Sequence, residues 1–317
     1  MGRERHPRRG SMQIWPRVRA KRIYPRIRSW VKNSKDVVSL GFLGYKVGMT
    51  HVMAKDPIAK KGELMIPVSV VECPNMKVFG LRFYASDAYG KRVVADVHDS
   101  KIDKDLSRRA NVKARDKFPE KFDDVVLVAH AQPKLTGIGK KRPEIFEIAI
   151  GGKDKTARIE YAKNMLGKEI GVKDIFKAGE FVDIHGVSKG KGFQGAVKRF
   201  GVPLLPPKSE KKKRGIGTLG PWHPNKVSIH VAQPGKMGYH SRTQYNNTIV
   251  LVSEDVSRII PKGDFPQYGK VKNNYVLIKG SVFGARKRPI LLIKSIRTKV
   301  KPIVYDVTYI SQESKTK

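Results

Sequence analysis

The 317-residue sequence has a single cysteine, few acidic residues and no long apolar run. Cys73 cannot form an internal disulfide, and the apolar stretch VSVVECP around it predicts a buried, reduced thiol in an intracellular, cytoplasmic protein. No apolar run approaches the roughly 18 residues that a membrane-spanning helix needs. We therefore expect no membrane contact.

Acidic residues are outnumbered more than two to one. The sequence has 65 Lys and Arg against 28 Asp and Glu, which gives a formal net charge of +37. Residues 1–35 and residues 185–245 each contain 12 Lys and Arg and one acidic residue, so much of the excess lies in two short segments. Two basic arms of this kind favour a polyanionic partner, because each phosphate that they neutralise releases counterions. We expect that partner to be nucleic acid.

The patterns of common catalytic, metal and nucleotide sites are also missing. There is no Gly-x-Ser-x-Gly elbow and no P-loop, and the eight histidines and one cysteine show no zinc-site spacing. Segment 190–195, GKGFQG, matches the dinucleotide fingerprint, but no acidic residue follows about 20 positions later and no βαβ alternation surrounds it. We interpret it as a backbone that phosphates can approach. The sequence thus predicts no catalytic residue, no metal, no cofactor and no small-molecule substrate.

The remaining sequence reads as a mainly β body. β-branched and alternating segments recur through residues 37–184 and 246–317, which predicts about eight to ten short strands. Helical structure is expected near 99–123, where charges are balanced, and near 154–170, where apolar residues recur from Ile159 to Ile170 at helical spacing. Because closing a sheet into a barrel removes its exposed strand edges, we expect a closed β-barrel.

The second basic segment interrupts this body. A predicted strand leads into residues 185–245 and another follows them, so we expect an excursion from one barrel and not a second domain. The expected organisation is an extended basic N-terminal arm (1–36), a barrel with small α insertions (37–184 and 246–317) and a basic, glycine-rich extension (185–245).

Aromatic residues stand among the cations of the extension. Trp222 and His223 lie in the proline-flanked loop TLGPWHPNK, and Trp222 either packs as an anchor in a turn or forms an exposed tip. Because the loop has few apolar neighbours, we favour a tip that stacks on nucleotides, an interaction worth about 1–3 kcal/mol per base. Stacking also favours flexible RNA over duplex DNA as the partner.

Four segments resemble the signature stretches of the universal third large-subunit ribosomal protein, the L-three family. They are GFLGYKVGMTHVM (41–53), HGVSKGKGFQGAVKRFG (185–201), GPWHP (220–224) and QPGKMGYHSRTQYN (233–246). The resemblance runs over nearly the whole chain. The Trp-His-Pro tip and the insertion at 99–123 resemble archaeal and eukaryotic members, and the short end after Ile310 favours the archaeal type.

The resemblance implies a translation-protein-type closed β-barrel and a structural, non-enzymatic role in the large ribosomal subunit. It further implies that the extensions enter the large-subunit rRNA, that neighbouring ribosomal proteins are partners, and that the protein acts early in subunit assembly. The tip, Trp222 and His223, would approach the rRNA of the peptidyl transferase centre. Two alternatives stay open: an RNA-modifying enzyme with basic substrate-delivery arms, and an architectural protein that compacts nucleic acid.

The residues expected to bind rRNA come from both basic segments. In the N-terminal arm they are Arg3, Arg5, Arg8, Arg9, Trp15, Arg17, Arg19, Lys21, Arg22, Arg26, Arg28 and Trp30. In the extension they are Lys189, Lys191, Phe193, Gln194, Lys198, Arg199, Lys211, Lys212, Lys213, Arg214, Trp222, His223, Lys226, Lys236, Tyr239, His240 and Arg242.

Overall fold

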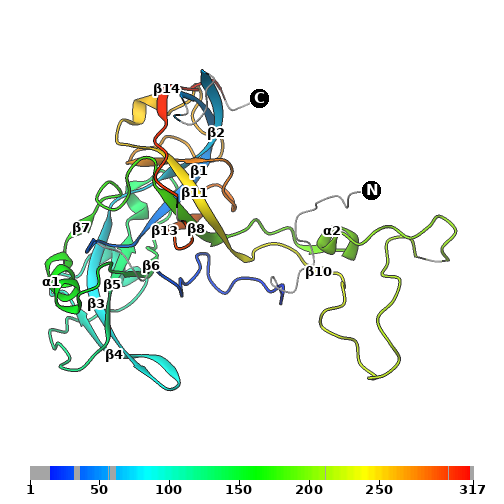
Figure 1. Cartoon of the computed structure of the whole chain (residues 1–317), viewed down its shortest axis with the longest axis horizontal. Helices are drawn as coiled ribbons and strands as arrows, with labels where there is room; N and C mark the ends of the chain where they lie inside the picture. The colour runs from blue at the N-terminus through cyan, green and yellow to red at the C-terminus, as the bar shows by residue number, and fades with distance from the viewer. Residues whose placement is uncertain are drawn as a thin grey trace. The chain divides into compact units, whose positions relative to one another are not determined.

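The computed structural model describes residues 15–31, 36–55, 57, 62–210, 212–298 and 300–314 (Figure 1). The chain divides into two compact units. The first, here called the extension unit, comprises Met1–Arg22 and Val187–Arg242. The second, here called the body, comprises Ile23–Gly186 and Thr243–Lys317. The N-terminal basic segment therefore contributes residues to both units.

The body is mainly β, which confirms the predicted class. Its larger sheet has the strand order β13-β8-β11-β12-β2-β1-β14. The strands are β1 (Gly41–Lys55), β2 (Glu63–Glu72), β8 (Phe181–Val187), β11 (Ser241–Ser253), β12 (Tyr275–Lys279), β13 (Pro289–Lys294) and β14 (Asp306–Ile310). β1 also pairs antiparallel with β13, with Leu43 opposite Leu291, so the pairings run in a ring through six strands. Closure of this ring into a barrel stays a prediction.

A smaller sheet has the order β4-β3-β5-β6, and β7 also pairs with β3. Its strands are β3 (Met76–Asp87), β4 (Gly90–His98), β5 (Asp124–Ala131), β6 (Ile145–Ala149) and β7 (Glu169–Ile170). Residues of both sheets share one apolar core, which includes Phe42, Phe83, Leu127 and Tyr275. One main core therefore joins the two sheets of the body.

The first residues of β1 show how the sequence permits this packing. Residues 41–48 are all buried, and β2 passes close to Gly44. A Cβ atom at Gly44 would lie 2.5 Å from Val71 Cγ1 and 2.9 Å from Cys73 Sγ, so only glycine allows this approach. Cys73 is a free, buried cysteine, as its apolar setting predicted.

The helix predicted near 154–170 forms but ends early. α1 spans Lys155–Met165, and Leu166 already has extended backbone angles. Gly167 follows with φ of +76°. Ile170, in β7, then pairs with Met76 of β3. The apolar residues predicted to line one helix, from Ile159 to Ile170, thus belong partly to α1 and partly to β7. Both elements place apolar side chains against the core, so their spacing resembled that of a single helix.

The helical prediction for 99–123 is wrong. This segment contains only a 3-10 turn, η2 (Lys104–Arg108), which begins where the Asp103 side chain accepts a hydrogen bond from the amide of Asp105. Leu106 is fully buried against Phe79 and Val128 of the small sheet. The segment is therefore an irregular chain that packs on the small sheet through Leu106 and through the rings of Phe118 and Phe122, which contact Phe83, and its charge balance did not reveal this.

The other short helices are α2 (Ala196–Phe200), η3 (Pro133–Leu135) and η4 (Val256–Arg258). Within the described residues, no helix is long and apolar enough to cross a membrane.

Candidate nucleic-acid interface

The root of the extension unit is a two-stranded ribbon. β9 (Phe193–Gln194) pairs antiparallel with β10 (Gly235–Lys236). The amide of Lys191 donates to the carbonyl of Met237, and the amide of Met237 donates to the carbonyl of Gly192, both at 2.9 Å. Segment 190–195 is therefore one side of a ribbon, followed by the five-residue α2, and not the turn into a long nucleotide-binding helix.

The ribbon closes at a glycine that no other residue can replace. Gly238 has φ of +79°, and a Cβ atom there would lie 2.0 Å from the carbonyl oxygen of Lys189. Tyr239 also has positive φ, at 55°, and its amide donates to the same Lys189 oxygen at 3.2 Å. The two sides of the root are thus held at main-chain contact distance.

The N-terminal segment joins this root. The amide of Ala20 donates to the carbonyl of Tyr239 at 2.7 Å. His240 Nε2 accepts a hydrogen bond from the amide of Gly238, so its Nδ1 carries the proton that is donated to the Val18 carbonyl at 2.8 Å. Burial lowers the pKa of His240, and the nearby Arg242, Arg17 and Arg199 lower it further. His240 is thus a neutral internal connection, and its ring nitrogens are already bonded.

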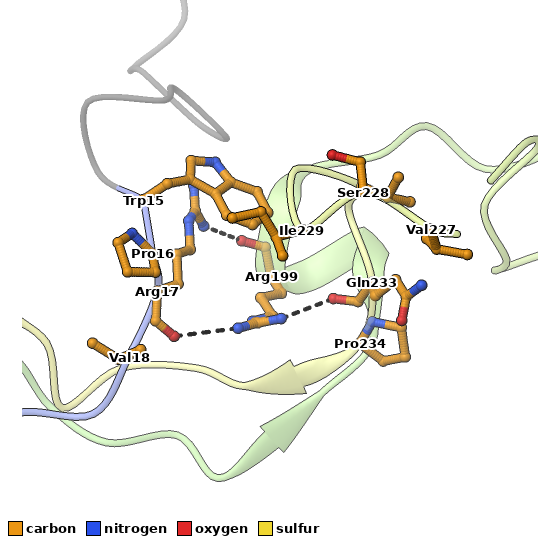
Figure 2. Close-up of a pocket in the computed structure, with 11 residues that line it drawn as sticks. Trp15, Pro16, Arg17, Val18, Arg199, Val227, Ser228, Ile229, Gln233 and Pro234 are labelled. Atoms are coloured by element: carbon orange, nitrogen blue, oxygen red, sulfur yellow. Dashed lines mark hydrogen bonds between the residues drawn. The ribbon is translucent and has the colours of Figure 1, made fainter. Parts of the chain in front are cut away.

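An aromatic and arginine cluster reinforces the junction (Figure 2). The Trp15 ring stacks on Phe200 with centroids 5.1 Å apart and an interplanar angle of 18°. The Arg17 guanidinium lies 4.4 Å from the centroid of the same Phe200 ring. Arg17 Nη1 donates to the Arg199 carbonyl at 2.7 Å, while Arg199 donates to the carbonyls of Arg17 and Gln233. Two predicted contact residues, Arg17 and Arg199, therefore hold the root together.

Most other predicted contact residues of the extension unit are exposed. They are Arg19, Lys21, Arg22, Lys189, Lys191, Phe193, Lys198, Lys212, Lys213, Arg214, Trp222, His223, Lys226 and Lys236. Trp222 is 81% exposed, as predicted, and Phe193 of the ribbon is 71% exposed. No described Lys or Arg of this unit forms an ion pair with a carboxylate. The unit thus presents unneutralised cations beside exposed aromatic rings.

Comparison with known proteins decides the family. The sequence model of ribosomal protein L3 matches residues 1–124 and 115–316. The chain belongs to the ribosomal protein L3 family. It is 46% identical to the large ribosomal subunit protein uL3 of Picrophilus torridus, over 99% of each chain. It is 46% identical to the uL3 of Thermoplasma acidophilum over 99% of this chain, and 43% identical to that of Methanocaldococcus jannaschii over 98%. These relatives are archaeal, in agreement with the predicted type.

Not every predicted contact of this L3 family chain lies in the extension unit. Trp30 is partly buried and packs against the core of the body. Its ring lies so close to Gly41 that a Cβ atom there would be 3.0 Å from it. Arg26 and Arg28 are exposed on the body, and Arg26 lies 4.0 Å from Glu147. The predicted contacts that fall outside the described residues are Arg3, Arg5, Arg8, Arg9 and Lys211. Gln194, Tyr239 and Arg242 are partly exposed.

The sequence did not predict the roles of Phe200 and Gln233. Phe200 packs against Trp15 and Arg17, and the Gln233 carbonyl accepts a hydrogen bond from Arg199. No local signal could have found these contacts, since they join segments far apart in the sequence. Among the residues that the structure describes, no group of three or more His, Cys, Asp or Glu could hold a metal ion.

Proposed function

We propose that this chain is a structural constituent of the large ribosomal subunit that binds large-subunit rRNA through its basic segments. The observation that carries the proposal is the extension unit, in which the exposed lysines and arginines that the structure describes form no ion pair with a carboxylate. The relatives support it, because proteins 46% identical over 99% of the chain are named large ribosomal subunit protein uL3.

The mechanism is charge neutralisation on a rigid support. The main-chain contacts of Gly238 and the Arg17 and Arg199 hydrogen bonds fix the root, so its cations face RNA without first having to be ordered. Lysines at the surface neutralise phosphates and position the chain, while exposed rings such as Phe193 and Trp222 stack on bases. RNA helices that would otherwise repel one another are held together in this way.

The finer parts of the proposal follow from the resemblance. Trp222 and His223 form the tip that organises rRNA near the peptidyl transferase centre, and the protein supports early assembly of the subunit. The N-terminal arm (1–36) and the extension (185–245) are the RNA-contacting parts, and neighbouring ribosomal proteins contact the rest. The chain acts in the cytoplasm as part of the ribosome and performs no catalysis of its own.

We also infer that the body is a closed β-barrel of the translation-protein type. The support is the ring of strand pairings, in which β13 is bonded antiparallel both to β8 and to β1. Leu43 and Leu291, which are opposite one another in β1 and β13, are both buried. If the ring is closed, the β13 amides should exchange as slowly as those of β2, whereas an open edge would exchange faster.

The salt dependence of rRNA binding tests the functional proposal. The full chain would be titrated against an in-vitro transcript of the large-subunit rRNA at several salt concentrations. Replacing Lys189, Lys191 and Lys198 by Gln should reduce the slope of log affinity against log salt by about 2, because each lost phosphate contact removes about 0.7–0.9.

The control removes the same charge from the exposed lysines Lys101, Lys104 and Lys117 of the body, and it should leave the slope unchanged. Equal slopes for the two triple variants would contradict an RNA interface on the extension unit. Equal affinity for duplex DNA would instead support the compaction alternative.

A further inference from the structure

A pocket of about 570 Å³ opens within the extension unit (Figure 2). The N-terminal segment contributes Trp15 and Pro16 to its lining, and residues 227–234 of the extension contribute Val227 and Ile229. Ile229 is 75% exposed and Val227 is 46% exposed, although both are apolar. A cavity of this volume lies in the range that accepts a small organic ligand, with apolar walls suited to a planar ring.

The lining of the pocket carries positive charge. Arg17 and Arg199 line it, and none of the lining residues that the structure describes is acidic. Arg17 Nε, Arg17 Nη2 and Arg199 Nε are buried without a hydrogen-bond partner among the described residues. Burial lowers the pKa of Arg17, and the like charges of Arg242 and Arg199 lower it further. An anion at the pocket would relieve this repulsion, whereas an apolar ligand alone would leave it in place.

We propose that this pocket receives one unstacked nucleotide of an RNA chain, with its base against Trp15 and Ile229 and its phosphate drawn by Arg17 and Arg199. The combination of apolar walls and uncompensated cations matches a base joined to a phosphate, and matches an apolar protein segment less well. Ser228 and Gln233, which also line the pocket, offer polar groups to the edge of a base. The inference rests on the proposed function and names a site where one nucleotide of the RNA is bound.

A matched pair of variants tests the pocket. Ile229→Asp places a carboxylate on its wall, and Leu219→Asp makes the same charge change at a residue that is 53% exposed and does not line the pocket. Both full-length variants would be titrated with the large-subunit rRNA transcript. We expect Ile229→Asp to weaken binding by about tenfold more than Leu219→Asp, since one stacked base contributes about 1–3 kcal/mol. Equal losses would overturn the proposal.

Cross-linking of the unsubstituted protein supplies a test that does not depend on the folding of a variant. The transcript would carry 4-thiouridine, and the cross-linked peptides would be identified by mass spectrometry. Cross-links within residues 15–18 or 227–234 support the pocket. Tight binding with cross-links confined to other segments would overturn it while leaving the proposed function intact. Failure of the unsubstituted protein to bind the transcript at all would instead contradict the proposed function, and the pocket with it.

Discussion

Arg17 and Arg199, 182 positions apart in the sequence, each donate a guanidinium hydrogen bond to the main-chain carbonyl oxygen of the other. Both guanidinium groups also lie against the Phe200 ring, at 4.4 Å and 5.0 Å from its centroid. Two like charges are thus held side by side by carbonyl oxygens and an aromatic face, without a carboxylate. Residues 15–22 and the root of the extension therefore belong to one structural unit.

Loss of the Arg17 side chain should loosen this unit. In Arg17→Ala, the hydrogen bond to the Arg199 carbonyl and the contact with Phe200 disappear, and a hydrogen bond from a charged group is worth about 1.5–3 kcal/mol. Amide hydrogen exchange of residues 15–22 and 196–201 should therefore become faster by about tenfold or more. Arg19→Ala is the control, because Arg19 is exposed and carries the same charge. Equal exchange in the two variants would show that the reciprocal pair does not hold the junction.

Two glycines with left-handed backbones allow a test of the root. In Gly238→Ala the new Cβ atom would meet the Lys189 carbonyl at 2.0 Å, so the ribbon must open and rRNA affinity should fall by at least tenfold. Gly192→Ala has a similar φ, +67°, but nothing lies within 4 Å of its Cβ position. It should cost only the strain of a left-handed residue, about 1–2 kcal/mol. Similar affinities for the two variants would exclude a role for close main-chain contact at Gly238.

The strands of the body could largely be predicted from the sequence, because β-branched alternation is a local property. The segments leading into and out of the extension form β8 and β11, which are neighbours in one sheet. Leu106 shows the limit of such reasoning. A single buried leucine in a charged segment has no periodicity, so the irregular chain over 99–123 looked helical.

The candidate site was predictable in its charge but not in its geometry. The excess of lysine and arginine identified both basic segments, and the lack of apolar neighbours identified Trp222 as exposed. The stacking of Trp15 on Phe200 and the assignment of His240 to an internal bond depend on contacts between distant segments. A single sequence carries no signal for such pairs, so cations that hold the root and cations that face solvent looked alike.

Acidification should loosen the N-terminal segment through His240. Its pKa is lowered in the folded protein from the ordinary value of 6.5, chiefly by burial. Above that value both the folded and unfolded forms are neutral, so the stabilisation is complete. As the pH falls below it, the unfolded form binds the proton first, and stability declines until the folded pKa is reached.

Hydrogen exchange of residues 15–22 between pH 7 and pH 5, corrected for the intrinsic pH dependence of exchange, measures the effect of His240. In His240→Gln, residues 15–22 should be less protected from exchange at pH 7. Their protection should not decrease further on acidification, because the titrating imidazole is gone. A variant that keeps the full pH response would assign the titration to another group.

Loss of the Glu72 carboxylate should destabilise the body. Its side chain is fully buried and accepts hydrogen bonds from the Tyr268 hydroxyl and from the amides of Lys272 and Asn273. The Asn273 side chain donates to it as well, at 2.8 Å. Glu72→Ala removes the acceptor of the buried Tyr268 hydroxyl and of the Lys272 and Asn273 amides, and since each unsatisfied group costs about 1–3 kcal/mol, we expect a loss of several kcal/mol in the free energy of unfolding. Burial and the Glu72 carboxylate also raise the pKa of Tyr268, so its hydroxyl stays a donor at neutral pH.

Denaturant unfolding of two further variants separates this network from a general effect of charge. Glu72→Gln keeps an oxygen for the three nitrogen donors and offers its amide to the Tyr268 hydroxyl, so it should be less destabilising than Glu72→Ala. Glu63→Ala removes a carboxylate from an exposed position of the same strand and should change stability by no more than about 0.5 kcal/mol. If Glu72→Ala were as stable as Glu63→Ala, the residues from Tyr268 to Asn273 would have to be held by apolar packing alone.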